Sequence, residues 1–380
     1  MGARTRSPGG VSRTWDRSGG VSRPFGGGEL GSWQAGGMAT APVRIGFLGA
    51  GFIATYHSKS LEHCGIPIER RGVFDPDTGR AEAFAAASGH TVYPSEEAVL
   101  DDCDAVYLCT WTSEHPRQLA AAADRGVHVF CEKPLAFTTA EAEEMASRAA
   151  AAGLVNQVGL VLRRSPAYLW SRSLIDDPAA GRVMAVVFRD DQFIPITGHY
   201  ASTWRADKRL VGAGTLLEHS IHDVDMLRFL VGDVTRVSAD TANFHGYDGI
   251  EDVCTATLRF VGGATGTLTS VWHDNIARPS MRRVEVFCER RHIVIEGDDW
   301  FGPVSWTDHD GTTGTLEGVA LSEAVEPLRD GAANPDGEFV RAVLNGLSAT
   351  PDLATAVEAH RIVDAIYASA ASGGTAVHLG

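Results

Sequence analysis

The chain has 380 residues, of which 44% are hydrophobic, and it carries a formal net charge of −15 at pH 7 with a pI near 5.3. A chain of this length can form two domains of roughly 100–200 residues each, and its apolar content excludes disorder for most of it. The acidic balance, without clustered Lys or Arg after residue 40, excludes nucleic acid as a partner. With this charge, a small neutral or cationic ligand fits better. No apolar run approaches the ~20 residues of a membrane span.

The first forty residues differ in kind from the rest. They are dominated by Gly, Ser and Arg and repeat Gly-Gly-Val-Ser-Arg at 9–13 and 19–23. Such a composition cannot pack a core, and it shows neither a secretory signal nor a transit helix. We expect residues 1–40 to be a disordered tail, or sequence upstream of a true start at Met38. The six scattered cysteines form no C-x-x-C pair, which favours reduced packing residues in a cytoplasmic protein.

From Val43 to Val161, short β-branched runs alternate with Ala-rich amphipathic stretches, a pattern that predicts βαβ units and a parallel, doubly wound sheet. We place this α/β domain at 41–162. The expected strands are Val43–Leu48, Gly72–Phe74, Thr91–Tyr93, Ala105–Cys109, His128–Cys131 and Val155–Val161. The expected helices are Ile53–Cys64, Thr78–Ala87, His115–Arg125 and Thr139–Ala152.

After Tyr168 longer runs alternate between apolar and polar residues, which predicts a large, mostly antiparallel sheet. One strongly apolar helix, Leu216–Leu230, interrupts these runs. A closing helix, Leu353–Ala371, could pack back on the first domain. The second domain, 163–380, is therefore expected to be α+β, with helices on one face of an open sheet. Its expected strands are Val183–Gln192, Val234–Phe244, Val253–Phe260, Ala264–Trp272 and Val284–Cys288.

A glycine-rich turn, Gly49-Ala50-Gly51-Phe52-Ile53-Ala54, follows the first strand and opens a helix. Its glycines let the backbone approach a pyrophosphate at the positive end of that helix. Asp75 closes the next strand, where a carboxylate accepts hydrogen bonds from the adenosine ribose and repels a 2′-phosphate. This favours NAD over NADP, although Arg80 is close enough in sequence to pair with a phosphate. The alternative is a glycine turn without a nucleotide.

Two polar segments follow neighbouring strands of the same predicted sheet. Thr110 to His115 follow the fourth strand, and Glu132-Lys133-Pro134 follow the fifth. Open α/β sheets bind ligands at the carboxyl ends of their strands, so Lys133 is the first candidate for catalysis. Thr110 and Ser113 could equally be ordinary turn and N-cap residues.

Glu218, His222 and Asp225 recur at i, i+4 and i+7, so they share one face of the expected helix Leu216–Leu230. The rest of this helix is apolar, and its polar stripe therefore needs partners or a cleft. A histidine oriented by a carboxylate can remove a hydroxyl proton near neutral pH. Satisfied core residues are the alternative. We expect no metal, because the spacing of Glu218, His219 and His222 matches no known zinc pattern and no cysteine is near.

Together, the glycine turn, the Thr110–His115 segment, Glu132-Lys133-Pro134 and the Gly212–Asp225 stretch resemble the Gfo/Idh/MocA oxidoreductases, which include glucose-fructose oxidoreductase and inositol 2-dehydrogenase. The resemblance runs from Val43 to the C-terminus. It implies a Rossmann domain that binds NAD(P), and a C-terminal domain that supplies substrate contacts and often the interface of a homodimer or homotetramer. The chain departs from the family where Glu218, Ser220 and Trp111 replace a usual aspartate, glycine and proline.

The resemblance also implies roles for individual residues. His222 corresponds to the family's catalytic histidine, which takes a hydroxyl proton while the adjacent carbon gives hydride to the nicotinamide. Lys133 corresponds to the lysine that steadies the reacting oxygen, and Glu218 to the acid one turn before the histidine. The implied cofactor contacts are Gly49, Gly51, Phe52, Ile53, Asp75, Thr110, His115, Glu132 and Lys133. The implied substrate contacts are Arg163, His199, Tyr200, Trp204 and Arg205.

We therefore expect an NAD(P)-dependent dehydrogenase that acts on a sugar, inositol or related polyol. An NAD-dependent glycosidase, which oxidises its substrate transiently on the same scaffold, is one alternative. A non-catalytic sensor of dinucleotide and sugar is another, and it is disfavoured because the chain keeps both Lys133 and His222.

Overall fold

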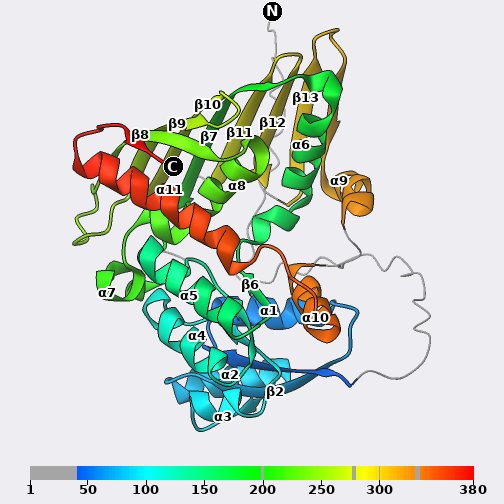
Figure 1. Ribbon diagram of the computed structural model, residues 1–380, viewed down its shortest axis with the longest axis vertical. Helices are drawn as coiled ribbons and strands as arrows, with labels where there is room; N and C mark the ends of the chain where they lie inside the picture. Colours follow the sequence, from blue (N-terminus) through cyan, green and yellow to red (C-terminus); the bar gives the residue numbers. More distant parts are fainter. Residues whose placement is uncertain (1–40, 198–200, 276–279, 299, 330–333) are drawn as a thin grey trace, which may run out of the picture. The chain divides into compact units, whose positions relative to one another are not determined.

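The computed structural model describes residues 41–197, 201–275, 280–298, 300–329 and 334–380, and they contain two β-sheets (Figure 1). The first sheet has six parallel strands in the order β3-β2-β1-β4-β5-β6, the order of a doubly wound dinucleotide-binding sheet. Its strands are β1 (Val43–Leu48), β2 (Ile68–Phe74), β3 (Thr91–Val92), β4 (Ala105–Leu108), β5 (His128–Cys131) and β6 (Asn156–Val158). All four residues of β4 are fully buried, as expected of a strand covered on both faces.

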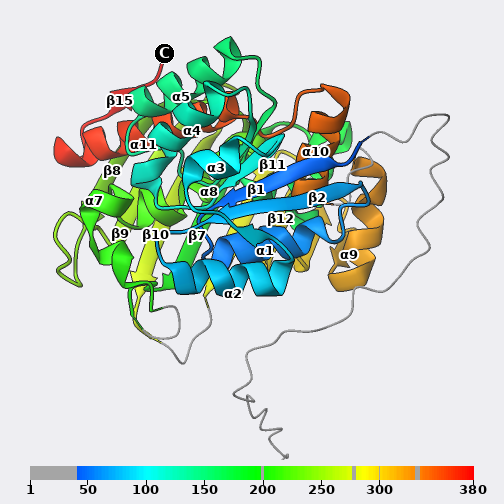
Figure 2. The same ribbon diagram turned by 90° about the horizontal axis from the view of Figure 1, so that it is seen from below.

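Helices lie on both sides of this sheet, and Figure 2 shows β1 and β2 between α1 and α2 on one side and α3 and α4 on the other. The clearest start signal is at α5, where the Thr138 side chain accepts from the Glu141 N–H and the Glu141 carboxylate accepts from the Thr138 N–H. The helices are α1 (Phe52–Leu61), α2 (Thr78–Ser88), α3 (Glu96–Leu100), α4 (His115–Ala123) and α5 (Thr139–Ala151).

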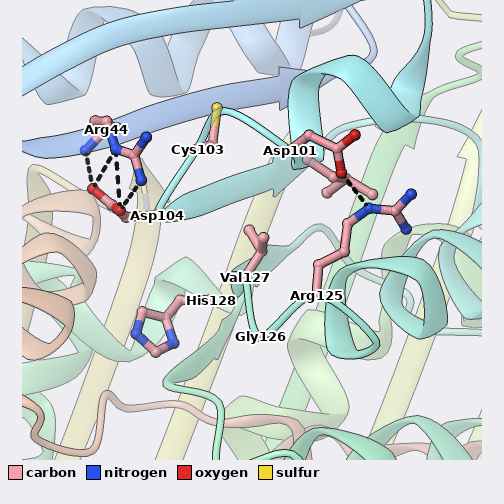
Figure 3. A pocket seen from close by; sticks show the side chains of 9 residues that line it. Arg44, Asp101, Cys103, Asp104, Arg125, Gly126, Val127 and His128 are labelled. Atoms are coloured by element: carbon pink, nitrogen blue, oxygen red, sulfur yellow. Dashed lines mark hydrogen bonds and ion pairs between the residues drawn. The ribbon is translucent and has the colours of Figure 1, made fainter.

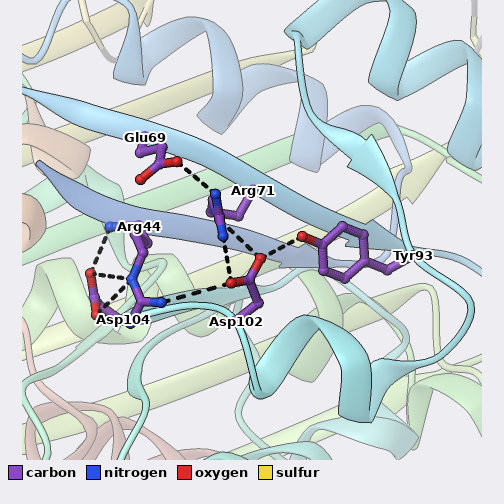
Figure 4. A network of polar contacts seen from close by, with 6 residues as sticks. All are labelled: Arg44, Glu69, Arg71, Tyr93, Asp102 and Asp104. Carbon is purple, nitrogen blue, oxygen red and sulfur yellow. Dashed lines mark hydrogen bonds and ion pairs between the residues drawn. The ribbon is translucent and has the colours of Figure 1, made fainter.

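Charged side chains connect β1, β2 and the turn before β4 (Figure 4). Arg44 Nη2 lies 2.7 Å from Asp104 Oδ1, and Arg71 Nη2 lies 2.5 Å from Asp102 Oδ1. The Tyr93 hydroxyl also donates to Asp102. Ion pairs as exposed as these contribute at most about 1 kcal/mol each, so they align strand ends whose stability comes from the buried core.

The second sheet has nine strands in the order β14-β13-β12-β11-β7-β10-β9-β8-β15, and only β7 and β10 pair in parallel among them. On β9, Cys254, Ala256 and Leu258 are buried while Thr255 and Thr257 are exposed, which is the alternation of a sheet covered on one face. The strands are β7 (Val183–Phe193), β8 (Val234–Ala242), β9 (Val253–Phe260), β10 (Thr265–His273), β11 (Met281–Cys288), β12 (Arg291–Asp298), β13 (Gly302–Asp308), β14 (Thr313–Leu316) and β15 (Val377–His378).

The covered face of the second sheet carries α6, α8 and α11 (Figure 1). Helix α11 also reaches the first sheet's helices, since Thr139 N donates to Asp364 and Arg361 pairs with Glu143. Within the described residues, no helix combines the length and apolar character needed to cross a membrane. The helices of this half are α6 (Pro166–Asp176), α7 (Lys208–Val211), α8 (Ile221–Val231), α9 (Gly318–Val325), α10 (Pro335–Asn345) and α11 (Leu353–Ala371).

The expected single helix Leu216–Leu230 is wrong in its first third. Thr215–His219 is wound as a π-helix, and α8 begins only after Ser220. At its start, the Glu251 carboxylate accepts the N–H groups of Gly214 and Leu216 at 2.7 and 2.9 Å, as a cap does at the first turn of a helix. At its end, Ser220 N donates to the Thr215 carbonyl five residues back, at 2.8 Å, which is the hydrogen bond of a π-helix.

Other expected boundaries differ for local reasons. The strand expected at Val155–Val161 shortens to β6 because a 3₁₀ turn begins at Val161. Strand β8 ends before Phe244, whose N–H donates to the Asp252 carboxylate instead of to a neighbouring strand. The sequence pattern does not predict the helices α3, α6, α7, α9 and α10, nor the strands β12 to β15.

Helix α10 follows the second sheet in sequence but packs into the core of the first. Phe339 and Val340 are fully buried in the cluster that contains Ile45 and Phe47 of β1. At its start, the Asn334 side chain accepts from Gly337 N and donates to the Ser60 carbonyl of α1. The first sheet is therefore completed by a helix that the chain reaches only after forming the second.

Candidate active site

The glycine turn has the backbone that a phosphate site needs. Gly49 has φ +88°, and a Cβ there would lie 2.5 Å from the Cys109 carbonyl oxygen, so only glycine fits. A Cβ at Gly51 would meet no atom within 4 Å, which leaves open space at the amino end of α1. Phe52 is exposed and Ile53 half-buried beside this space. The turn therefore fits the pyrophosphate of a dinucleotide.

Asp75 lies against this turn and is 7% exposed. Its carboxylate accepts the N–H of Ala50 and that of Asp77, both at 2.9 Å. Arg80 lies 3.3 Å from Asp75 and 3.3 Å from Asp77, so its guanidinium is already paired with acids. This arrangement suits ribose hydroxyls better than a 2′-phosphate.

Thr110 and His115 both have partners inside the protein. The Thr110 hydroxyl donates to Gln118 Oε1 at 2.7 Å. Burial lowers the pKa of His115, and its Nδ1 donates to the Pro134 carbonyl at 3.0 Å. His115 thus holds the Glu132-Lys133-Pro134 loop through the Pro134 carbonyl.

Lys133 joins the two sequence motifs. Its Nζ donates to the backbone carbonyl of Glu218 at 2.8 Å, and its own N–H donates to Glu132 Oε2 at 3.1 Å. Burial lowers the pKa of the Lys133 ammonium below its ordinary value of 10.5. A lysine at the carboxyl edge of the first sheet therefore reaches the turn that precedes α8.

His222 stands in a positively charged environment. Burial lowers its pKa well below 6.5, and the charges of Lys133, Arg282 and His219 lower it further. Its Nδ1 is buried and has no hydrogen-bond partner among the described residues. His222 is therefore neutral at physiological pH, which is the form that accepts a proton.

The expected contact between Glu218 and His222 does not form in the described structure. Glu218 Oε1 instead accepts from Arg205 Nε at 2.8 Å. The π-helical turn changes the angular relation between positions 218 and 222, so their spacing no longer places both side chains on one α-helical face.

The expected substrate residues fall into three groups. Arg163 forms two hydrogen bonds with Asp225, at 2.8 and 2.7 Å, which also accounts for the third member of the polar stripe. The Arg205 guanidinium stacks 4.3 Å from the Trp204 ring centroid. His199 and Tyr200 lie outside the described residues.

Sequence reasoning missed a charged cluster next to His222. Arg282 on β11 pairs with Asp223 at 2.7 Å and with Asp190 on β7 at 2.9 Å. His219 lies 2.7 Å from the same Asp190. Burial raises the pKa of Asp223 to about 7, against the opposing effect of Arg282. One signal in the sequence could have revealed this cluster: Arg282 is a charged residue at a position of β11 where the alternating pattern places side chains toward the core.

The described residues include no group of three or more His, Cys, Asp or Glu side chains arranged to hold a metal ion. A separate cavity of about 440 Å³ opens at the amino ends of the first sheet, away from the glycine turn (Figure 3). Its arginines are paired, Arg44 with Asp104 and Arg125 with Asp101. The cavity therefore offers little to an anionic ligand.

Comparison with known proteins agrees with this geometry. Residues 43–160 match the domain family described as an oxidoreductase family with an NAD-binding Rossmann fold, and residues 168–294 match the GFO/IDH/MocA C-terminal domain. The chain is 34% identical to 1,5-anhydro-D-fructose reductase of Ensifer adhaerens over 58% of its own length and 66% of that protein. It is 31% identical to scyllo-inositol 2-dehydrogenase (NAD(+)) of Bacillus subtilis over 59% of its length and 66% of that protein.

The chain thus matches slightly less than two thirds of the length of these two relatives. A crystal structure of an oxidoreductase domain protein from Kribbella flavida superposes with a TM-score of 0.79 at 25% identity, covering 89% of this chain and 99% of that one. The chain belongs to the Gfo/Idh/MocA family of oxidoreductases, and its first sheet is that family's NAD-binding Rossmann fold.

Proposed function

We propose that this protein is an NAD-dependent dehydrogenase that interconverts a secondary hydroxyl and a ketone on a sugar, inositol or related polyol. The hydrogen bond from Lys133 Nζ to the Glu218 carbonyl carries the proposal, because it brings the lysine of the nucleotide-binding sheet to the turn before His222. The relatives named 1,5-anhydro-D-fructose reductase and scyllo-inositol 2-dehydrogenase support the substrate class. NADP is the weaker alternative cofactor, because the Asp75 carboxylate lies beside the glycine turn and would repel a 2′-phosphate.

His222 would act as the base, since its lowered pKa keeps it neutral and able to take the hydroxyl proton. Lys133 would donate a hydrogen bond to the reacting oxygen and stabilise the negative charge that develops there. Bound NAD would supply the acceptor for hydride. In this proposal Glu218 does not contact the reacting atoms. Its side-chain carboxylate binds Arg205, and its backbone carbonyl binds Lys133.

Substrate contacts would come from the segment between β7 and α8. The stacked pair Trp204 and Arg205 offers an apolar ring face beside hydrogen-bond donors, which suits a sugar ring. His199 and Tyr200 precede this pair in sequence and are proposed to contribute with it. Arg163 would act mainly through Asp225, to which it is bonded. The domain division that goes with this proposal is 41–162 for cofactor and 163–380 for substrate.

We also propose a homodimer or homotetramer that uses the face of the second sheet without helices (Figure 1). Val187 and Phe287 are 42% and 36% exposed on neighbouring strands of that sheet, β7 and β11. A cytoplasmic location is supported by the six cysteines, all free and buried. Light scattering after size exclusion tests the assembly, and a monomer at micromolar concentration would contradict it.

The activity is tested by following nicotinamide absorbance with NAD or NADP and a panel of inositols, aldoses, sugar acids, anhydrosugars and glycosides. We expect turnover in the wild type and its loss in Lys133→Ala and His222→Ala. Lys59→Ala, which removes an exposed lysine of α1, is the matched control and should keep wild-type rates. Release of a free sugar from a glycoside without net cofactor reduction would identify a glycosidase instead. NAD binding without any turnover would identify a sensor.

A further inference from the structure

Three buried histidines, each from a different helix, hold the loop that carries Lys133. His57 of α1 contacts Glu132 at 2.9 Å, and His115 of α4 contacts the Pro134 carbonyl at 3.0 Å. His360 of α11 accepts from Leu135 N at 3.2 Å, in keeping with a pKa that burial lowers to about 4. His115 and His360 are therefore neutral supports, and His57 differs from both.

His57 lies between two carboxylates. It is 0% exposed, its Nε2 is 2.9 Å from Glu132 Oε1, and its Nδ1 is 2.7 Å from Asp336 Oδ1. A neutral imidazole has only one N–H, whereas two carboxylate partners require two. Burial alone would lower the pKa of His57, but Asp336 and Glu132 outweigh it and raise the pKa to about 10. His57 is thus a buried cation throughout the physiological range.

Glu132 has little freedom to leave this arrangement. One carboxylate oxygen accepts from His57, and the other accepts from the Lys133 N–H. The opposite side is closed by Gly159, where a Cβ would overlap the Glu132 carboxylate. The position of the Lys133 backbone therefore depends on the orientation of Glu132.

We propose that His57, together with Asp336 of α10, is a positioning residue for Lys133, acting through the Glu132 carboxylate. The inference rests on the proposed function, in which the Lys133 ammonium meets the reacting oxygen. Asp336 keeps both ring nitrogens of His57 protonated, so Glu132 always finds a donor. The chain is Asp336, His57, Glu132, Lys133, and only its last member touches substrate.

The other groups that face His57 are aromatic. The Tyr107 ring lies 5.4 Å from the imidazole and the Phe130 ring 4.7 Å. The Tyr56 ring lies 5.7 Å away on α1. Burial and the charge of Asp336 raise the pKa of Tyr107 and of Tyr56, so both phenols stay neutral and add no charge beside His57. Lys133 itself is faced by Glu218, Glu132, Arg205 and Arg282.

The same core supplies a matched control. His90 is 6% exposed and packs against Phe47 and Phe84, with ring centroids 5.0 and 5.4 Å away. Its Nδ1 contacts the Ser88 hydroxyl, and no contact with Glu132 or Lys133 is present in the described structure. His90→Gln thus removes a buried imidazole from the same aromatic cluster without touching the proposed chain.

The test compares His57→Gln and Asp336→Asn with His90→Gln and with the conservative Asp336→Glu. One readout is kcat beside the NAD dissociation constant. The other needs no substrate: it is the rate at which acetic anhydride labels Lys133, measured by peptide mass spectrometry against Lys59 in the same molecule and over a range of pH. Thermal unfolding is recorded for every variant, so loss of fold is seen directly.

We expect His57→Gln and Asp336→Asn to lower kcat by about tenfold to hundredfold, the effect of a misplacement of ~1 Å, with the NAD dissociation constant unchanged within about threefold. A loosened, better hydrated Lys133 should also label with a pH midpoint shifted upward toward that of Lys59. Asp336→Glu should recover much of both, and His90→Gln should match the wild type.

An unchanged Lys133 labelling profile in His57→Gln would overturn the proposal, as would an equal loss of kcat in His57→Gln and His90→Gln. If the wild type turns over no substrate, the dehydrogenase proposal fails, and the labelling result alone still decides whether His57 positions Lys133. If His57→Gln does not fold, Asp336→Asn decides by the same two readouts.

Discussion

The Asp75 side chain is held firmly beside the glycine turn. Two backbone N–H groups, from Ala50 and Asp77, fix its carboxylate, and that carboxylate in turn pairs with Arg80. In the proposed NAD site, this arrangement would present an acid to the ribose and would keep a cation from acting on a 2′-phosphate.

We expect Asp75→Ser to weaken NAD binding about 10- to 100-fold, the loss of hydrogen bonds to a charged group worth about 1.5–3 kcal/mol. NADP binding should tighten, because the acid that repels a 2′-phosphate is gone and Arg80 loses one of its two acidic partners. Titration calorimetry with both cofactors measures this. Asp77→Ser is the control, since serine still caps α2 and Asp75 stays in place. Equal NAD affinity in Asp75→Ser and the wild type would contradict the role.

The two groups that carry the proposed mechanism, His222 and Lys133, predict the pH dependence of oxidation. The pKa of His222 lies below 6.5, so the neutral base persists below that pH and is lost only under more acidic conditions. The pKa of Lys133 lies below 10.5, so its charge is lost before that pH is reached. We expect kcat/KM to stay flat through pH 6.5 and to fall on the alkaline side. Lys133→Arg should move the alkaline limb upward, and an acid limb at or above pH 6.5 would exclude His222 as the base.

At the scale of elements, the π-helical turn Thr215–His219 is held in place by hydrogen bonds from distant segments. Glu251 holds its start through Gly214 and Leu216, and the Tyr367 hydroxyl donates to Glu251 and accepts from Leu217 N. The turn then delivers the Glu218 carbonyl to Lys133.

Gly214→Ala should disrupt this turn, because a Cβ there would overlap the Glu251 backbone. We expect the free energy of unfolding to fall by about 1–3 kcal/mol, as for other overpacked sites, and activity to fall with it. Gly262→Ala is the control, since its Cβ would meet nothing within 4 Å. Scanning calorimetry and turnover measure both variants. A Gly214→Ala protein as stable and active as Gly262→Ala would show that the turn tolerates a side chain.

These elements also show what the sequence can and cannot predict. The sequence predicts helix α11 at Leu353–Ala371 and the structure has it there, because its apolar period is a local signal. The two sheets could likewise be predicted from the spacing of apolar residues along the strands and from the turn residues between them. The start of the π-helical turn is capped by Glu251, more than thirty residues away, and a helical repeat carries no sign of that contact. The pairing of Arg205 with Glu218 and of Arg282 with Asp223 likewise arises only when distant segments meet.

For the molecule as a whole, α10 makes the first sheet depend on the end of the chain. Phe339 packs edge-on against Tyr107 and Phe130, with ring centroids 5.6 and 5.7 Å away, and Asp336 of the same helix pairs with His57. The nucleotide-binding half is therefore not complete at residue 162 in the described structure.

Phe339→Ala should cost about 3–5 kcal/mol, as expected for an aromatic residue that is 0% exposed. The loss should appear in the melting of the first sheet and should weaken NAD binding with it. Leu347→Ala, just beyond the same helix and 58% exposed, should change stability by less than about 0.5 kcal/mol. Calorimetry with and without NAD measures both, and equal effects of the two substitutions would contradict the place given to α10.

This route of the chain also sets the order of events during synthesis. Val43 leaves the ribosome about 300 residues before Phe339, which at about 5–20 residues per second is a wait of roughly 15–60 s. Throughout that interval the growing chain lacks α10, which in the described structure packs against the apolar cluster of β1 and α1. A nascent chain arrested before residue 335 should therefore bind chaperones through its first sheet, and release to completion should end that binding.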